Sequence, residues 1–112
     1  MSKNRQEKPS EFLDEGETEV ATDVDRKVEP PRLYQVLLHN DDYTTMDFVV
    51  MILMDVFHLP EEQAIEIMLR VHYQGIGLAG VYPYDVAETK VHKVAELARQ
   101  AEFPLRCSLE PV

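Results

Sequence analysis

The sequence predicts an α+β fold in which three helices pack on a small three-stranded sheet, in the chain order β-α-α-β-α-β. Two short segments, residues 33–39 and 105–109, carry the branched or alternating apolar residues that are typical of strands. Three longer segments repeat apolar residues at helical spacing, and prolines or polar turn residues separate them. The sequence contains no internal repeats. We therefore expect a sandwich of helices against a single sheet.

The composition of the 112 residues separates an N-terminal extension from a folded body. Residues 1–31 hold nine acidic and five basic residues, have Phe12-Leu13 as their only adjacent large apolar pair, and end in two prolines. Polar composition without periodicity predicts a disordered extension. Residues 32–112 carry nearly all the large apolar residues and are numerous enough to bury a core without help. One domain is expected there.

The first predicted strand, residues 33–39, is followed by the loop Asn40-Asp41-Asp42 and by a helix over about 45–57. Thr44 and Asp47 have the spacing of a capping box, in which a hydroxyl and a carboxylate bind free amides at the start of a helix. Because this helix is apolar on nearly every side, we expect it to be largely buried.

A second helix is predicted from Pro60 to Gly75. Proline suits the first helical position, the glutamates after it suit the positive end of the helix dipole, and glycine is typical of a helix stop. The residues expected on its buried face are Ala64, Ile65, Met68, Leu69 and His72. The strand predicted over 76–82 contains two further glycines, so we expect it to be irregular, with close backbone approaches.

The third helix is predicted to begin at Pro83 and Asp85 and to end before Pro104. The residues expected on its inner face are Ala87, Val91, Val94, Ala95 and Ala98. The last strand alternates Leu105, Cys107 and Leu109 with polar residues. This alternation predicts one buried face and a buried thiol at Cys107.

Composition and charge argue against several classes of function. Eleven basic and 21 acidic residues give a formal net charge of −10, which disfavours binding to nucleic acid or to an anionic membrane surface. A single cysteine excludes an internal disulfide framework. No secretory signal is visible, and the most apolar stretch, residues 46–57, is too short to span a membrane and contains two aspartates. We expect a soluble, cytoplasmic protein.

Three features are candidates for binding chemistry. The loop Asn40-Asp41-Asp42 offers an amide oxygen and two carboxylates, the acceptors that an ammonium group or a metal ion requires, although the same residues form plain turns. His72, near the end of the second helix, is either bonded to backbone or free to bind a ligand. The first two helices carry four methionines, which either fill a core or line a pocket for several apolar shapes.

The sequence contains no strong catalytic or metal-binding pattern. It lacks the H-E-x-x-H and G-x-S-x-G motifs and a phosphate-binding glycine loop. His39, Asp41 and His72 could be combined into a metal site, but no ligand spacing supports it. We therefore expect that the protein is not an enzyme and uses no metal or cofactor.

Four blocks of the predicted body resemble the ClpS family of ATP-dependent Clp protease adaptors. They are Asn40-Asp41-Asp42-Tyr43-Thr44 with Met46 and Phe48-Val49, Met68-Leu69-Arg70-Val71-His72-Tyr73-Gln74-Gly75, Val86-Ala87-Glu88-Thr89-Lys90, and Pro104-Leu105. Together they span about residues 32–110 in the family's order. Two departures are mild: Thr45 stands where the family often has proline, and Asp85 where it often has glutamate.

The resemblance implies an adaptor of the N-end rule, or N-degron, pathway. Such an adaptor binds proteins whose first residue is Leu, Phe, Tyr or Trp and delivers them to the ClpA unfoldase of the ClpAP protease. The residues implied to bind the α-amino group are Asn40, Asp41 and His72, with Asp42 and Thr44 in support. The residues implied to form the side-chain pocket are Met46, Val49, Met68, Val71 and Leu105.

The docking face for the unfoldase is implied at Asp85 and Lys90, with Tyr43 and Glu88 as further candidates. From the residues alone, these are exposed polar positions near the start of a helix. The extension, residues 1–31, is expected to be fed toward the unfoldase during delivery. The alternative interpretation is a non-catalytic scaffold or interaction domain, in which the acidic loop and the methionines serve only packing.

Overall fold

The computed structural model describes residues 29–112, so most of the extension expected to be disordered lies outside the described residues. Six elements follow one another in the chain. They are β1 (Leu33–His39), α2 (Met46–Asp55), α3 (Glu61–Gln74), β2 (Ile76–Pro83), α4 (Tyr84–Ala101) and β3 (Arg106–Pro111). The predicted α+β class and the order β-α-α-β-α-β are confirmed, and β1 has the predicted bounds.

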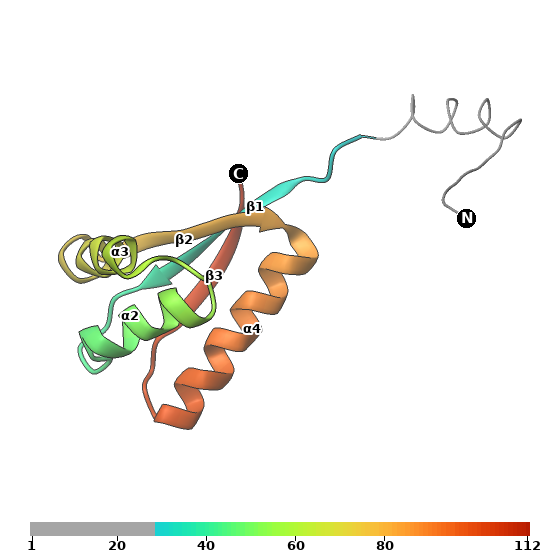
Figure 1. The fold of residues 1–112 in the computed structure, drawn as a ribbon. Helices are drawn as coiled ribbons and strands as arrows, with labels where there is room; N and C mark the ends of the chain where they lie inside the picture. Colours follow the sequence, from blue (N-terminus) through green and yellow to red (C-terminus); the bar gives the residue numbers. More distant parts are fainter. Residues whose placement is uncertain (1–28) are drawn as a thin grey trace, which may run out of the picture. The chain divides into compact units, whose positions relative to one another are not determined.

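β1 is the central strand of a three-stranded sheet with the order β2-β1-β3 (Figure 1). Both neighbours run antiparallel to it. His39, the last residue of β1, pairs with Ile76 at the start of β2 and with Arg106 at the start of β3. The end of β1 and the starts of β2 and β3 therefore meet at one end of the sheet.

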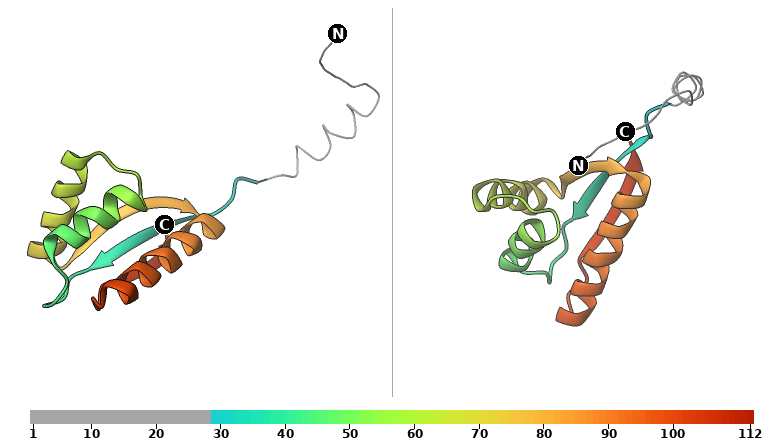
Figure 2. Two further views of the ribbon diagram at one scale, coloured as in Figure 1. Left: turned by 60° about the horizontal axis from the view of Figure 1, so that its bottom comes forward. Right: turned by 45° about the vertical axis from the view of Figure 1, so that its right-hand side comes forward.

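The hydrophobic core lies between one face of the sheet and all three helices. Val36 and Leu38 of β1 are fully buried, and they form one cluster with residues of α2, α3 and α4. Alternate residues of a strand point to the same face, so this is the face that the helices cover. In the left view of Figure 2, β1 runs between the α2–α3 pair and α4. Each buried large side chain contributes roughly 1.5–3 kcal/mol, which makes this cluster the main stabilising feature.

The first helix differs from the prediction at its start and in its burial. Its N-cap is Thr45, whose hydroxyl accepts a hydrogen bond from the amide of Phe48 at 3.1 Å, and not Thr44. Thr44 belongs to the preceding loop, because its amide and its hydroxyl both donate to Asp41. The expectation of a largely buried helix is also wrong, since the helices form one layer and α2 has a solvent side. Its buried residues are Val49, Ile52 and Leu53.

The buried face of α3 overlaps the predicted one only in part, because Ala64 and Met68 are buried as predicted and the other three predicted residues are not. The buried residues are Ala64, Ile67, Met68 and Val71, whereas Ile65, Leu69 and His72 are exposed. Both sets have helical spacing, and contact with β2 and α2 selects between them. Pro60 is the N-cap rather than the first helical residue. Gly75 ends the helix as predicted, with the positive φ of 92° that glycine adopts without steric cost.

β2 is irregular, as predicted. Its register with β1 shifts between Val36 and Leu37. A β-carbon on Gly77 would lie 2.6 Å from Cγ2 of Val71, which is too short for a real contact. The missing side chain at Gly77 therefore lets α3 approach the strand closely.

α4 is the longest helix in residues 29–112 and packs across the sheet through small and branched residues. Ala87, Val94 and Ala98 are buried and Val91 is partly buried, as predicted, whereas Ala95 is exposed. In the part of the chain that the structure describes, no helix combines the length and the apolar character needed to cross a membrane.

Candidate functional site

The candidate site lies where β1 leads into α2 (Figure 1). The backbone amide of Asn40 donates to the carbonyl oxygen of Gly75 at 2.9 Å, which joins this loop to the C-terminal end of α3. His72 lies in the last turn of α3. Leu105 directly precedes Arg106, which pairs with His39. The fold therefore brings Asn40, His72 and Leu105 to the same end of the sheet.

Asp41 organises the loop through its carboxylate. Oδ1 accepts hydrogen bonds from the amides of Tyr43 and Thr44 at 2.8 and 2.7 Å, and Oδ2 accepts one from the Thr44 hydroxyl at 2.7 Å. Each carboxylate oxygen can accept about two bonds, so Oδ2 keeps a free position. Burial raises the pKa of Asp41, but the hydrogen bonds from Thr44 and Tyr43 outweigh it and hold the pKa below its usual value. The loop thus keeps a negative charge and one free acceptor.

Three other polar candidates face solvent. Asn40, Asp42 and His72 are all exposed. The ring of His72 packs edge-to-face with the ring of Tyr73, with centroids 4.7 Å apart and an interplanar angle of 81°. Within residues 29–112 no hydrogen bond holds the His72 ring, so it is not the backbone-bonded histidine considered from the sequence. Its nitrogens are therefore accessible to a ligand.

Four of the five apolar pocket candidates belong to one cluster. Val49 of α2, Met68 and Val71 of α3, and Leu105 are part of the hydrophobic core and are only 2–8% exposed. Met46, the first residue of α2, is 40% exposed. It lies one helical turn before Val49, and therefore at the solvent edge of this cluster.

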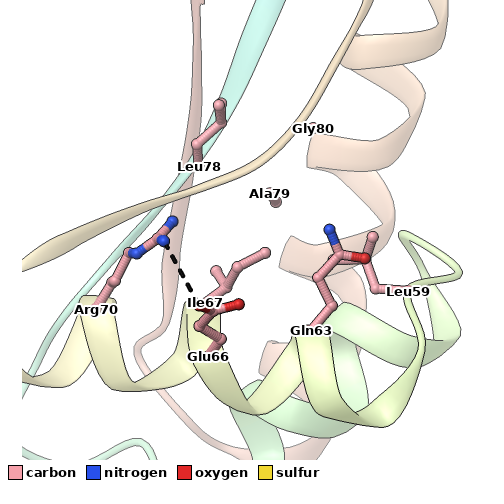
Figure 3. A pocket seen from close by; sticks show the side chains of 8 residues that line it. All are labelled: Leu59, Gln63, Glu66, Ile67, Arg70, Leu78, Ala79 and Gly80. Atoms are coloured by element: carbon pink, nitrogen blue, oxygen red, sulfur yellow. Dashed lines mark ion pairs between the residues drawn. The ribbon is translucent and has the colours of Figure 1, made fainter.

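A hollow of about 380 Å³ opens at a different place, between α3 and β2 (Figure 3). Leu59, Ile67 and Leu78 contribute its apolar lining, and the ion pair of Arg70 with Glu66, at 3.9 Å, lies on its helical side. None of the five pocket candidates lines it. The hollow is therefore separate from the site at the end of the sheet.

Lys90 has a structural contact that the sequence analysis missed. Its ammonium donates to the carbonyl oxygen of Val56, beyond the last residue of α2, at 2.7 Å, and lies 5.3 Å from the ring centroid of Tyr82. Lys90 is half-buried, so the expectation of an exposed position is wrong for this residue. A positive charge is favourable at a helix C-terminus. Sequence spacing gives no sign of this cap, because the lysine comes from another helix, 34 residues further along the chain.

A second ring and the start of α4 complete the surroundings of Lys90. The ammonium lies 5.8 Å from the ring centroid of Phe57, so two aromatic rings accompany the carbonyl contact. The other docking candidates on α4, Asp85 and Glu88, are exposed, and so is Tyr43 in the acidic loop. Glu88 accepts a hydrogen bond from the hydroxyl of Tyr84 at 3.3 Å, and all three residues are accessible from solvent.

Residues 29–108, which form most of this fold and carry the candidate site, match a known protein family. The family model described as "ATP-dependent Clp protease adaptor protein ClpS" matches residues 29–108, which include every candidate site residue. The chain belongs to the ClpS family. As a member it is an adaptor of an ATP-dependent Clp protease, and the resemblance stated from four sequence blocks is confirmed.

Individual ClpS proteins are similar over most of the chain. The ClpS adapter of Syntrophus aciditrophicus (strain SB) is 60% identical over 86 residues, which cover 77% of this chain and 80% of that protein. The one of Desulfotalea psychrophila is 52% identical over 110 residues, 98% of each chain. The solved structure of Agrobacterium tumefaciens ClpS2 bound to L-phenylalaninamide matches with a TM-score of 0.71 at 38% identity, covering 74% of this chain and 100% of that one.

His39 and Cys107, the residues considered for metal binding and as a buried thiol, have surroundings that do not favour reactive chemistry in this ClpS-family chain. His39 Nε2 lies 2.7 Å from the hydroxyl oxygen of Ser108 on β3. Residues 29–112 contain no group of three or more His, Cys, Asp or Glu side chains that could hold a metal ion. Cys107 is partly buried, and burial raises the pKa of its thiol to about 12, so the reactive thiolate is not populated at neutral pH.

Proposed function

We propose that this chain binds the N-terminal residue of substrate proteins, when that residue is Leu, Phe, Tyr or Trp, and delivers these proteins to a ClpA-type unfoldase of the ClpAP protease. The observation that carries the proposal is the similarity to ClpS2 bound to L-phenylalaninamide. That ligand has a free α-amino group, an aromatic side chain and an amide where the first peptide bond would be. It therefore stands for an N-terminal phenylalanine.

The α-amino group is the first feature to be recognised. Its pKa of about 7.7–8.0 makes it mostly a cation with three donors at neutral pH. In the proposal, the side-chain oxygen of Asn40 and a neutral nitrogen of His72 accept hydrogen bonds from it. Asp41 supplies negative charge, directly through the free position on Oδ2 or through water. Asp42 and Thr44 support the loop, Thr44 through its two bonds to Asp41.

The side chain of the first residue is the second feature. It enters between Met46 at the edge and the buried residues Val49, Met68, Val71 and Leu105. Burying a Leu or Phe side chain contributes roughly 1.5–3 kcal/mol. Hydrogen bonds to a charged group contribute about 1.5–3 kcal/mol each. Micromolar binding corresponds to about 8 kcal/mol, so the side chain alone is insufficient, and the contacts to the α-amino group reach this value only at the upper end of their range.

Delivery requires a second surface. The proposed docking face is Asp85 and Lys90, joined by Glu88 and Tyr43. Asp85 and Glu88 are exposed at the start of α4, where a partner can reach them, and a direct contact with Lys90 would compete with its bond to Val56. Residues 1–31 are proposed to be fed toward the unfoldase. The adaptor itself makes and breaks no covalent bond.

A pair of peptides tests the proposal. A fluorescent peptide that begins with Phe is titrated with the full chain, and the same peptide with an acetylated N-terminus serves as the control. We expect micromolar or tighter binding of the free peptide and at least tenfold weaker binding of the acetylated one, which has lost its charge and two donors. A scaffold without N-terminal specificity would treat the two peptides alike, and that result would overturn the proposal. Mass spectrometry of the recovered peptide would reveal any covalent change.

A further inference from the structure

We infer that Tyr73 is a positioning residue, whose ring holds the imidazole of His72 in the orientation that receives the substrate's α-amino group. The inference rests on the proposed role of His72. Its basis is the geometry of the two rings, whose centroids are 4.7 Å apart at an interplanar angle of 81°. This is the edge-to-face arrangement that the electron distribution of aromatic rings favours.

The imidazole needs such a restraint. A histidine that accepts a hydrogen bond through a chosen nitrogen is usually oriented by a bond to the other nitrogen. Within residues 29–112 the His72 ring has no such bond, and it is exposed. The backbone beneath it is held, because Gly75 caps α3 and accepts from the amide of Asn40 at 2.9 Å. The freedom left at this end of α3 is in the side chain, and the Tyr73 ring restricts it.

Core packing does not account for Tyr73. The residue is 75% exposed, which is unusual for a large aromatic side chain placed next to a ligand-binding candidate. Its removal should therefore cost the fold little. A ring that is ordered before the ligand arrives lowers the entropy cost of binding, and this is the benefit that the contact provides.

Two substitutions separate the ring from the hydroxyl. In the full chain, Tyr73→Ala removes the restraint and Tyr73→Phe keeps it. The quantity measured is the ratio between the affinities for a free Phe-initiated peptide and for its acetylated twin. We expect Tyr73→Ala to lower this ratio by roughly 2- to 10-fold, and Tyr73→Phe to retain it. The preference for N-terminal Phe over Gly should stay unchanged in both, because the apolar walls are intact.

Leu69→Ala is the matched control, since Leu69 is a 39% exposed apolar residue one turn earlier on α3 and has no proposed role.

Proton NMR gives a second readout. The ring current of Tyr73 changes the chemical shifts of nearby protons only. The chemical shifts of the carbon-bound imidazole protons of His72 should therefore change in Tyr73→Ala and stay the same in Tyr73→Phe. Thermal unfolding verifies that each variant is folded, and Tyr73→Leu replaces Tyr73→Ala if the latter is not.

The outcomes distinguish the inference from the proposed function. If the unmodified chain prefers the free peptide and Tyr73→Ala keeps the full preference, the positioning role is refuted and the proposed function stands. If Tyr73→Phe loses as much as Tyr73→Ala, the hydroxyl acts instead of the ring, which also refutes the inference. If the unmodified chain does not distinguish the two peptides, the proposed function fails and the inference fails with it.

Discussion

The backbone amide of Asn40 donates to the carbonyl oxygen of Gly75 at 2.9 Å, so the residue that follows β1 is bonded to the residue that ends α3. This bond uses only main-chain atoms. It holds the acidic loop beside the last turn of α3 and leaves the exposed side chain of Asn40 free for a ligand. The backbone of Asn40 thus positions the loop, and the recognition proposed for this residue falls to its side chain.

Replacing Asn40 by alanine should therefore weaken binding without weakening the fold. Asn40→Ala keeps the amide that binds Gly75 and removes the side-chain acceptor. We expect a loss of about 1.5–3 kcal/mol in affinity for a Phe-initiated peptide, or about 10- to 150-fold, with an unchanged melting temperature. Isothermal titration calorimetry measures the affinity, and calorimetric unfolding measures the melting temperature. Gln63→Ala is the control, because it removes an exposed side-chain amide that lines the separate hollow between α3 and β2. An unaltered dissociation constant would mean that the amine is bound elsewhere.

Met46 should act as a gate at the edge of the pocket. It is 40% exposed, and its bulk would oppose residues that branch close to the backbone, such as Ile and Val. Met46→Ala should improve the affinity for peptides that begin with Ile or Val by roughly tenfold, because relief of overpacking is worth 1–3 kcal/mol. Fluorescence anisotropy with a peptide series checks this. Met54→Ala removes a similarly exposed methionine from the same helix and should change nothing. Equal rejection of Ile and Val by Met46→Ala would refute the gate.

Acid should destabilise the fold partly through Asp41. Hydrogen bonds from Thr44 and Tyr43 hold its pKa below the ordinary value of 3.8, despite an opposing effect of burial. The carboxylate therefore contributes stability above about pH 4, and the contribution is lost as the pH falls through the lower, folded-state pKa. The free energy of unfolding is measured in urea between pH 6 and 3. At pH 6 it should be lower for Asp41→Asn than for the original chain, and it should decrease less for Asp41→Asn as the pH falls. Asp42→Asn is the control. Parallel pH profiles for the original chain and Asp41→Asn would contradict this role.

Lys90 should stabilise the protein before it meets any partner. Lys90→Met removes the hydrogen bond to Val56 and the charge beside Phe57 and Tyr82. We expect a loss of about 1.5–3 kcal/mol in the free energy of unfolding, as for other hydrogen bonds to charged groups. Chemical denaturation measures it. Lys93→Met changes an exposed lysine on the same helix and should have little effect. If the two variants are equally stable, the cap on α2 is unimportant and Lys90 is free for docking alone.

Local signals in the sequence were enough for the order and type of the elements. Residues 33–39 form a strand with the predicted bounds, because branched and aromatic residues lie between Pro31 and a polar loop. Gly75 ends α3 because glycine tolerates the left-handed conformation that a helix stop requires. The family was also readable from four blocks in order, and the family model spans residues 29–108.

Tertiary packing decided what periodicity and spacing leave open. α3 carries apolar residues on two faces, and only its contact with β2 and α2 determines that Ile67 and Val71 are buried while Ile65 and Leu69 are exposed. Thr45 caps α2 in place of the predicted Thr44, because the hydroxyl of Thr44 donates to Asp41. The bond from Lys90 to Val56 and the meeting of Asn40 with the end of α3 join residues about 35 positions apart. Such contacts depend on how the elements pack, and local sequence preferences act only over a few residues.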